Sequence, residues 1–222
     1  MPPSQTTPSR QLPRGPHRLA REEVLASQRG RMLEAMAEAV AEKGYAATTV
    51  GDVVSRAGVS RKTFYEHFED KEACFLAAWD AGVELVFEAI VAAAARADGP
   101  IDRSRLATRA YLETLADKPA FARSFLIEVV AAGPYAEQRR ADVHRRFADL
   151  IRNLQSEASR ELDLPDPPPE VYLAAVGGIN ELVYERVRAG RTETLPELED
   201  AIVYLQLALF AGHEIAAAAT RR

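Results

Sequence analysis

The sequence predicts an all-α protein, with a three-helix unit near the N-terminus, a longer helical region after it, and about nine helices in total. Alanine is abundant and runs of β-branched residues are few, which favours helix. Apolar residues recur at helical spacing in successive segments, and glycine or proline separates one segment from the next. No pair of strands with alternating apolar residues is found.

The first segment is expected to be an arm. Residues 1–20 hold five prolines together with Arg10, Arg14 and Arg18, and this proline density is incompatible with a regular helix. We interpret residues 1–20 as a flexible basic arm. It is either an ordinary terminal segment or one that contacts an acidic partner.

The first helix is predicted over residues 22–43, where one apolar face repeats at intervals of three and four. Its members are Leu33, Met36, Ala37, Val40 and Ala41. Gly44 directly follows and is a usual helix stop.

Two short helices are predicted next, followed by a long one. Thr49 and Asp52 have the spacing of a capping box, which opens a helix through Ala57. Gly58-Val59-Ser60 is a tight turn in which Gly58 can take a positive φ and Ser60 can cap the helix over residues 61–68. Residues 70–72 then open a helix that runs to about residue 96.

Five further helices are predicted from the positions of the breaks. Proline and glycine at residues 98–100, 133–134, 163–169 and 190 separate helices at about 102–116, 120–131, 135–162, 167–189 and 195–219. The last of these opens on Thr194-Leu195-Pro196-Glu197, which has the capping-box pattern.

Charge is distributed unevenly. The chain has a net charge of −5, but residues 1–67 hold ten Lys and Arg against seven Asp and Glu, and the remainder holds 18 against 26. A local basic segment suits a nucleic-acid contact in spite of the acidic total.

The stretch TTVGDVVSRAGVSRKTFYEHFEDK, residues 48–71, has the pattern of a helix-turn-helix. Its apolar residues, with Met36, Val40 and Tyr45 from the preceding helix, make one small core: Val50, Val53, Val54, Ala57, Val59, Phe64 and Phe68. The polar residues left outward on the second helix of the motif are suited to bases and phosphates: Arg61, Lys62, Thr63, Tyr65 and His67.

This stretch resembles the DNA-binding domain of TetR-family transcription regulators. The resemblance rests on Thr49, on the turn at residues 57–60, on Thr63-Phe64-Tyr65 with His67-Phe68, and on Lys71-Glu72. It is close over about residues 21–80. It implies a DNA-binding domain at residues 21–70 and a ligand-binding and dimerisation domain at residues 71–222.

The resemblance also implies roles for the matching residues. Ser60, Arg61, Lys62 and Thr63 stand where base-reading residues stand, and Arg61 is the best candidate for guanine. Thr49, Tyr65, His67 and Lys71 resemble phosphate contacts. The alternative for His67 is a local cap or packing role, and for the others a solvated side chain.

A partner and an effector follow from the same resemblance. One recognition helix reads few base pairs, so the expected partners are a palindromic double-stranded DNA operator and a second copy of the chain. The dimer would form through the last two helices, at about 167–189 and 195–217. Gly177 and Gly178 would allow close approach, whereas Val203, Leu207 and Phe210 supply either interface bulk or intramolecular core.

The family places a small-molecule effector among the middle helices, and a largely apolar ligand is expected. The candidate ligand-binding residues are the aromatic and isolated polar ones in this region: Phe87, Tyr111, Phe121, Phe125, Glu128, Tyr172, Asn180 and Tyr184. Each aromatic residue is alternatively part of the core. Repression by operator binding is expected, and the alternatives are activation or regulation without a small molecule.

Other functional classes are disfavoured. The histidines are His17, His67, His144 and His213, and they form no metal-binding pattern. No nucleophile or dinucleotide motif occurs, so we expect no catalytic residue, no cofactor and no enzyme. Cys74 is expected to be a small buried hydrophobic residue. No secretory signal or membrane span is apparent, and a cytoplasmic location is expected.

Overall fold

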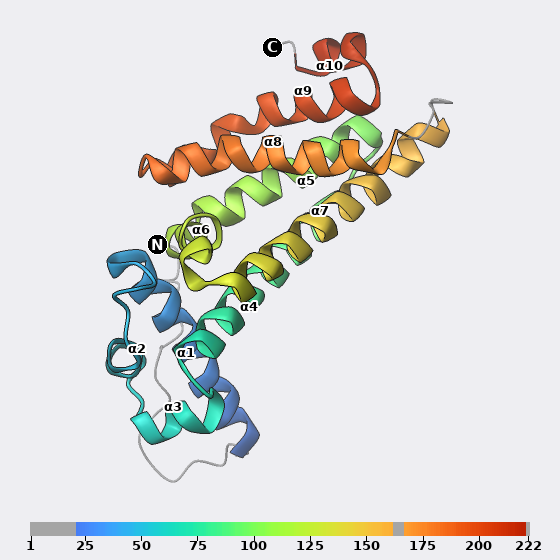
Figure 1. The fold of residues 1–222 in the computed structure, drawn as a ribbon. Helices are drawn as coiled ribbons and strands as arrows, with labels where there is room; N and C mark the ends of the chain where they lie inside the picture. The colour runs from blue at the N-terminus through green and yellow to red at the C-terminus, as the bar shows by residue number, and fades with distance from the viewer. Residues whose placement is uncertain (1–20, 162–166, 221–222) are drawn as a thin grey trace, which may run out of the picture.

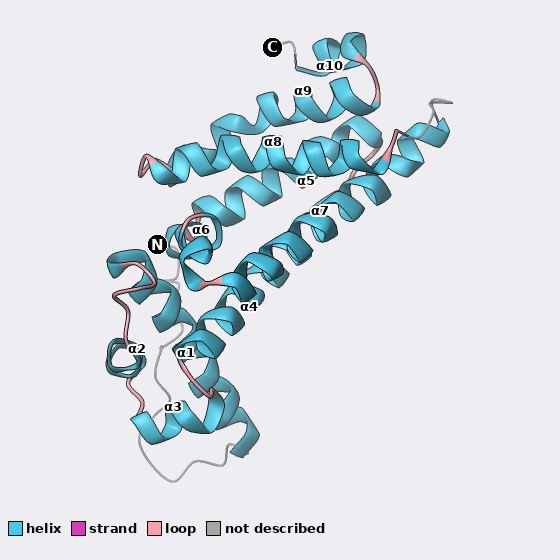
Figure 2. Ribbon diagram, viewed as in Figure 1, coloured by secondary structure: helices cyan, strands magenta, loops and turns pink. Residues whose placement is uncertain are grey.

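The computed structural model describes residues 21–161 and 167–220, and the regular structure within these ranges is entirely helical (Figure 2). The predicted all-α class is confirmed. The expected basic arm, residues 1–20, lies outside the described residues.

Ten α-helices and two 3-10 helices follow one another along the described part of the chain. They are α1 (Arg21–Lys43), α2 (Val50–Ala57), α3 (Arg61–His67), α4 (Lys71–Ala94), α5 (Pro100–Ala116), α6 (Pro119–Leu126), η1 (Glu128–Ala132), α7 (Pro134–Glu161), α8 (Pro169–Arg188), η2 (Thr192–Leu198), α9 (Glu199–Phe210) and α10 (His213–Thr220). Helices α1–α3 gather at one end, and α4 leads from them to the larger bundle of α5 and α7–α10 (Figure 1).

Capping residues define the two helices of the helix-turn-helix. Thr49 accepts the Asp52 N–H and Asp52 accepts the Thr49 N–H, so the predicted capping box is present at the start of α2. Gly58 ends α2 with φ +64°, a conformation that most side chains disfavour. Ser60 then caps α3 by accepting the Thr63 N–H at 3.0 Å.

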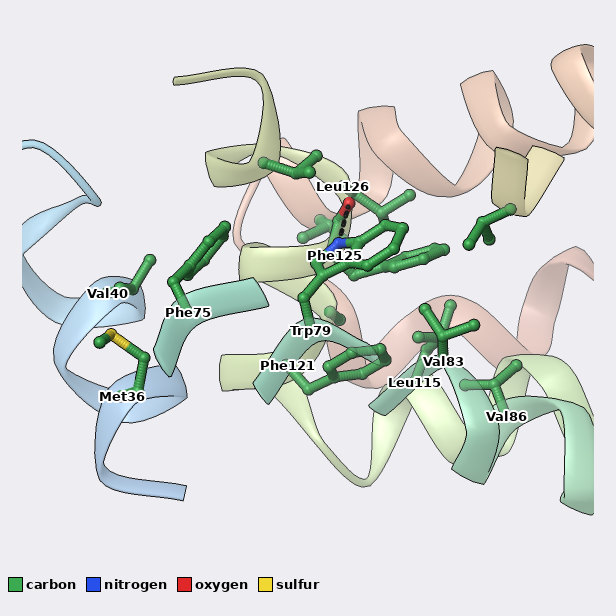
Figure 3. Packing of buried hydrophobic residues seen from close by; sticks show 14 of the residues in the cluster. Met36, Val40, Phe75, Trp79, Val83, Val86, Leu115, Phe121, Phe125 and Leu126 are labelled. Atoms are coloured by element: carbon green, nitrogen blue, oxygen red, sulfur yellow. Dashed lines mark hydrogen bonds between the residues drawn. The ribbon is translucent and has the colours of Figure 1, made fainter. Parts of the chain in front are cut away.

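One apolar core joins the small N-terminal unit to the bundle. Met36 of α1 and Phe75 of α4 lie at one end of the cluster in Figure 3, and Leu115 of α5 lies further along it. Trp79 is 1% exposed, stacks on Phe125 of α6 at 5.4 Å between ring centroids, and donates its indole N–H to the Phe125 carbonyl. The core is therefore continuous across residues 70 and 71, where the two domains were expected to meet.

Cys74 lies inside this core, as expected from the sequence. The side chain is fully buried on the first turn of α4. Burial raises the pKa of the thiol to about 12, against a smaller opposing effect of Arg29. The residue thus packs as a hydrophobic group.

A buried charge network connects α5 with the C-terminal helices. Glu199 of α9 is 8% exposed and is paired with both Arg105 and Arg109 of α5. Burial opposes ionisation of Glu199, but hydrogen bonds from Arg109 and Arg105 outweigh it and lower the pKa of the carboxyl group. Arg105 also donates to the Ala219 carbonyl of α10, so α5, α9 and α10 are held together.

The single helix predicted at 195–219 is wrong. The chain instead forms η2, α9 and α10, and Gly212 at φ +98° separates the last two. Thr194 is not an N-cap, because its hydroxyl donates to the Arg191 carbonyl and accepts from the Arg186 guanidinium at 2.8 Å. Likewise, the helix predicted at 120–131 divides into α6 and η1 at Ile127.

The close approach of α4 and α6 depends on Gly82. A Cβ atom at this position would lie 1.9 Å from the Phe121 ring. We expect Gly82→Ala to lower the free energy of unfolding by about 1–3 kcal/mol or more, because the buried ring must move.

Gly30→Ala is the control, since nothing lies within 4 Å of its Cβ position in α1. A gain of about 0.5–1 kcal/mol in the free energy of unfolding is expected there. Urea unfolding of both variants checks the contrast, and equal effects would contradict it.

The capping box at α2 makes stability depend on pH. The pKa of Asp52 is lowered from 3.8 to about 2, chiefly by a hydrogen bond from Lys43 at 2.5 Å and then by those from Thr49. Because the folded state favours the carboxylate, its contribution is complete above the unfolded value and is lost as the pH falls toward 2. Asp52→Asn should thus unfold at lower urea concentration than the wild type at pH 7, with the difference shrinking below pH 4.

Urea titrations at several pH values measure this difference. In a Lys43→Met background the pH dependence of the difference should be smaller, because the largest cause of the shift is gone. A difference that stays constant from pH 7 to pH 3 would rule out this role for Asp52.

Candidate DNA interface and effector cavity

The first turn of α3 carries the four residues for which the resemblance implies base contacts. Ser60, Arg61 and Lys62 are exposed, and Thr63 is half-buried with its hydroxyl 2.9 Å from that of Ser60. Phe64, which is fully buried, anchors the inner side of the helix. This arrangement presents consecutive polar groups outward from a firmly packed helix.

Two cations extend from this turn. The Lys62 side chain is 88% exposed and its nearest acidic partner is Glu66 at 4.0 Å. A guanidinium nitrogen of Arg61 lies 3.4 Å from the position that a Cβ on Gly51 would occupy, so Arg61 reaches the first turn of α2. The two side chains therefore cover the start of both motif helices.

The four residues implied as phosphate contacts differ in their surroundings. Tyr65 is 54% exposed with its ring edge against Phe64. Thr49 is exposed, but its hydroxyl serves the capping box. His67 is half-buried, and its Nε2 atom is buried without a hydrogen-bond partner in the described structure.

Lys71 is turned toward the protein. Its ammonium donates to the Tyr45 carbonyl at 3.0 Å and lies 4.2 Å from the centre of the Tyr45 ring. The same ring packs on Phe75 at 4.8 Å between centroids. Lys71 thus ties the start of α4 to the loop between α1 and α2, and two of its three N–H groups remain for an anion.

Glu128 binds the backbone N–H group of Tyr45, whose carbonyl group is bound by Lys71. This η1 residue is 8% exposed, and its carboxylate accepts the Tyr45 N–H at 2.9 Å. Its second oxygen lies 3.3 Å from the Arg123 guanidinium. Glu128 therefore connects the bundle to the helix-turn-helix and does not line the cavity, although it was a candidate ligand-binding residue.

A cavity lies among α5, α7, α8 and α9, with Ile90 of α4 and Phe125 of α6 at its edges. It is partly open to solvent. Its walls are mainly apolar, as is usual for small-molecule sites: Ile90, Ala107, Phe125, Phe147, Leu150, Ile151, Leu154, Val176, Ile179 and Ile202.

Seven polar side chains also line this cavity: Ser104, Thr108, Tyr111, His144, Gln155, Asn180 and Gln206. Ser104 donates to the Gln206 side-chain oxygen at 2.6 Å, which links α5 to α9. Burial lowers the pKa of His144, as does Arg140, and the hydrogen bond with Asn180 opposes them. Burial raises the pKa of Tyr111, whose hydroxyl group therefore stays protonated at neutral pH.

Three of the eight predicted ligand-binding residues line the cavity, namely Tyr111, Phe125 and Asn180. The other aromatic candidates lie in the core around it. Phe87 stacks on Phe147 at 4.3 Å, Phe121 on Phe125 at 5.4 Å, and Tyr172 on Phe210 at 4.8 Å. Tyr184 packs against the main core.

His144, Gln155 and Gln206 line the cavity but were not expected there from the sequence. A signal for His144 was present, because it shares one face of α7 with apolar residues at intervals of three and four: Phe147, Ile151 and Leu154. No comparable local signal marks Gln206, which is brought to the cavity by the packing of α9 on α5.

The dimer interface was expected on α8 and α9, which lie side by side in the bundle, with α10 packed on the far side of α9 (Figure 1). Val203, Leu207 and Phe210 are buried within the chain, which decides for the intramolecular alternative. Leu173 and Leu182 of α8 are exposed, and Gly177 between them has nothing within 4 Å of its Cβ position.

Neither a metal site nor a membrane-spanning helix is found in the described part of the chain. Among the side chains that the structure describes, no three His, Cys, Asp or Glu residues come together as metal ligands would. No helix in residues 21–161 and 167–220 combines the length and hydropathy that a membrane span requires.

Comparisons with known proteins identify the N-terminal unit. Residues 32–78, which include the helix-turn-helix, match the model of the bacterial regulatory proteins of the tetR family. The uncharacterized HTH-type transcriptional regulator YerO of Bacillus subtilis (strain 168) is 42% identical over 48 residues. That match covers 22% of this chain and only 17% of YerO.

Solved structures share the fold over most of the chain. FadR from Bacillus subtilis, a transcriptional regulator solved in complex with stearoyl-CoA, aligns with a TM-score of 0.72 and 16% identity over 82% of this chain and 98% of its own. A regulatory protein of the tetR family from Rhodococcus RHA1 aligns with a TM-score of 0.66 and 25% identity over 82% of this chain and 96% of its own.

The family model matches the segment that carries the recognition turn. These relatives are transcription regulators rather than enzymes, and the two solved structures share the fold over 82% of this chain. Residues 32–78 are therefore identified as the DNA-binding unit of the tetR family of bacterial regulatory proteins, within a fold of the TetR type.

Proposed function

We propose that this TetR-family regulator binds a palindromic operator as a homodimer and releases it when a largely apolar molecule enters the cavity of the bundle. One observation carries the proposal. A recognition turn that presents Ser60 to Thr63 outward is joined, through one continuous core and the Glu128–Tyr45 hydrogen bond, to a mainly apolar cavity.

We assign base recognition to the first turn of α3. The residues around this turn are assigned to phosphate contacts, which position the protein on the DNA. Arg61 has a planar fork that matches the O6 and N7 acceptors of guanine. Tyr65 and His67, together with Thr49 and the free N–H groups of Lys71, would contact phosphates on either side. Residues 1–67 carry more basic than acidic residues, which supports a DNA contact by this part of the protein.

Two copies are needed for specific binding, because one short recognition helix reaches few base pairs. Helices α8 and α9 offer a surface for this contact. Leu173, Leu182 and Leu209 are exposed on them, at 45%, 38% and 42%. Leu173 lies one helical turn from the open Gly177 position, and exposed apolar side chains of this kind favour helix packing between two chains.

The effector would occupy the cavity among α5, α7, α8 and α9. Its predominantly apolar walls suit a ligand with a hydrocarbon chain or ring system. The stearoyl-CoA complex of FadR, which has the same fold, supports an acyl-type ligand for this chain.

The cavity and the DNA-binding unit are linked through α6 and η1. Phe125 lines the cavity and its carbonyl accepts the Trp79 indole N–H of α4. Three residues later, Glu128 accepts the Tyr45 N–H of the loop that precedes α2. A ligand that displaces Phe125 would therefore act on α4 and on this loop together, and release requires that it bind the two arrangements unequally.

Arg61→Ala tests the operator contact. We expect a loss of operator affinity of about 1–3 kcal/mol with relaxed preference at one base pair of each half-site. Selection of bound sequences from a random DNA pool, followed by titration of the selected site, measures both effects. The control is Arg145→Ala, an exposed arginine of α7, for which no change is expected.

Two half-sites with centres about 34 Å apart are expected in the selected DNA. Unchanged affinity and preference in Arg61→Ala would remove this residue from the reading surface. A selected sequence with a single half-site would argue against the dimer.

Glu128→Ala tests the link between the two sites. Removing the acceptor leaves the Tyr45 N–H unpaired, so the factor by which an effector lowers operator affinity should fall toward one while cavity binding is retained. Operator titrations with and without an effector found by screening measure this factor. Glu128→Gln keeps an acceptor oxygen and should restore much of it, and the exposed Glu137→Ala is the neutral control. A factor unchanged in Glu128→Ala would refute the proposed route.

A further inference from the structure

The walls of the cavity contain hydrogen-bonding groups but no formal charge. Among the described residues that line it there is no lysine, arginine, aspartate or glutamate. The one titratable base is His144, and burial together with Arg140 lowers its pKa, so the imidazole is neutral at neutral pH. An ionised carboxylate placed here would leave water without gaining a cationic partner.

The polar groups are arranged on facing helices. Ser104, Thr108 and Tyr111 follow one another at helical spacing along the inner face of α5. His144 of α7 and Asn180 of α8 form a hydrogen-bonded pair in another part of the wall. With Gln206 of α9, the cavity has polar positions on all four of its walls, embedded in apolar surface.

Two neutral donors in this wall are not used within the protein. Tyr111 lines the cavity, and its hydroxyl group has no hydrogen-bond partner among the described residues, so it can donate to a ligand. Gln206 accepts from Ser104 and Thr108 through its oxygen, which leaves its NH₂ group to donate. Both side chains are half-buried, and a ligand oxygen in the cavity would give these donors a partner.

We propose that the cavity selects an effector whose polar group is an uncharged hydrogen-bond acceptor, such as the carbonyl of an ester, thioester or amide, and disfavours the free carboxylic acid. The Tyr111 hydroxyl donates to that oxygen. This inference rests on the proposed function, since it takes the cavity to be the effector site, and it adds the chemical nature of the ligand's polar end.

A carboxylate could be held instead at the cavity mouth by Arg140, which lies one turn before His144 and close enough to lower its pKa. Arg140 is not part of the cavity wall. If Arg140 held a carboxylate in this way, the free acid would bind more tightly than the ester.

The test uses the full chain and three probes that share one saturated hydrocarbon chain: the fatty acid, its methyl ester and the parent alkane, each in a medium and a long chain length. Calorimetric titration at neutral pH measures affinity, and displacement of a fluorescent operator measures release. We expect the ester to bind at least about tenfold more tightly than the acid and more tightly than the alkane.

Tyr111→Phe removes only the hydroxyl group. It should weaken ester binding by about threefold to tenfold and leave alkane binding unchanged. The matched control is Tyr184→Phe, because Tyr184 packs in the core outside the cavity. A Tyr184→Phe variant with the same selective loss would overturn the assignment of Tyr111.

The outcomes separate this inference from the function on which it rests. Acid binding equal to or tighter than ester binding would overturn the uncharged acceptor and leave an apolar effector intact. Failure of every probe to bind would contradict the proposed effector itself. Ester binding that is weakened to this extent in Tyr111→Phe, with operator release weakened in parallel, supports both.

Discussion

The orientation of the recognition helix depends on how the backbone of one residue, Tyr45, is held on both sides. Glu128 accepts its N–H from the bundle side, and Lys71 donates to its carbonyl from the start of α4. In the same loop, between α1 and α2, the buried hydroxyl group of Thr48 donates to the Gly44 carbonyl. Because α2 begins directly after this loop, the placement of the helix-turn-helix follows from contacts made by two distant parts of the chain.

Local features of the DNA-binding unit could be predicted from the sequence because they depend on near neighbours. The capping box of Thr49 and Asp52, the positive φ of Gly58 and the N-cap at Ser60 each need only residues within one turn. The apolar spacing of Met36 and Val40 likewise reports a buried helix face, and both side chains are fully buried. The fold class and the recognition turn follow from such signals.

Features of the bundle were less predictable because they depend on long-range packing. Thr194 has the spacing of a cap, yet Arg186 occupies its hydroxyl and a helix does not start there. Glu128 stands in an apolar run, which suggested a ligand contact, but its partner Tyr45 is 83 residues away. Aromatic residues such as Tyr172 and Phe87 carry the same local pattern whether they line a cavity or stack behind it.

The burial of Cys74 has a consequence for how the regulator senses its surroundings. Thiolate is the form of cysteine that reacts with oxidants and alkylating agents, and burial holds this thiol protonated with a pKa of about 12. Peroxide or an electrophile would reach it only after the core around it had opened. Burial therefore shields Cys74 in the folded state, and a response to oxidative conditions would have to begin at another residue.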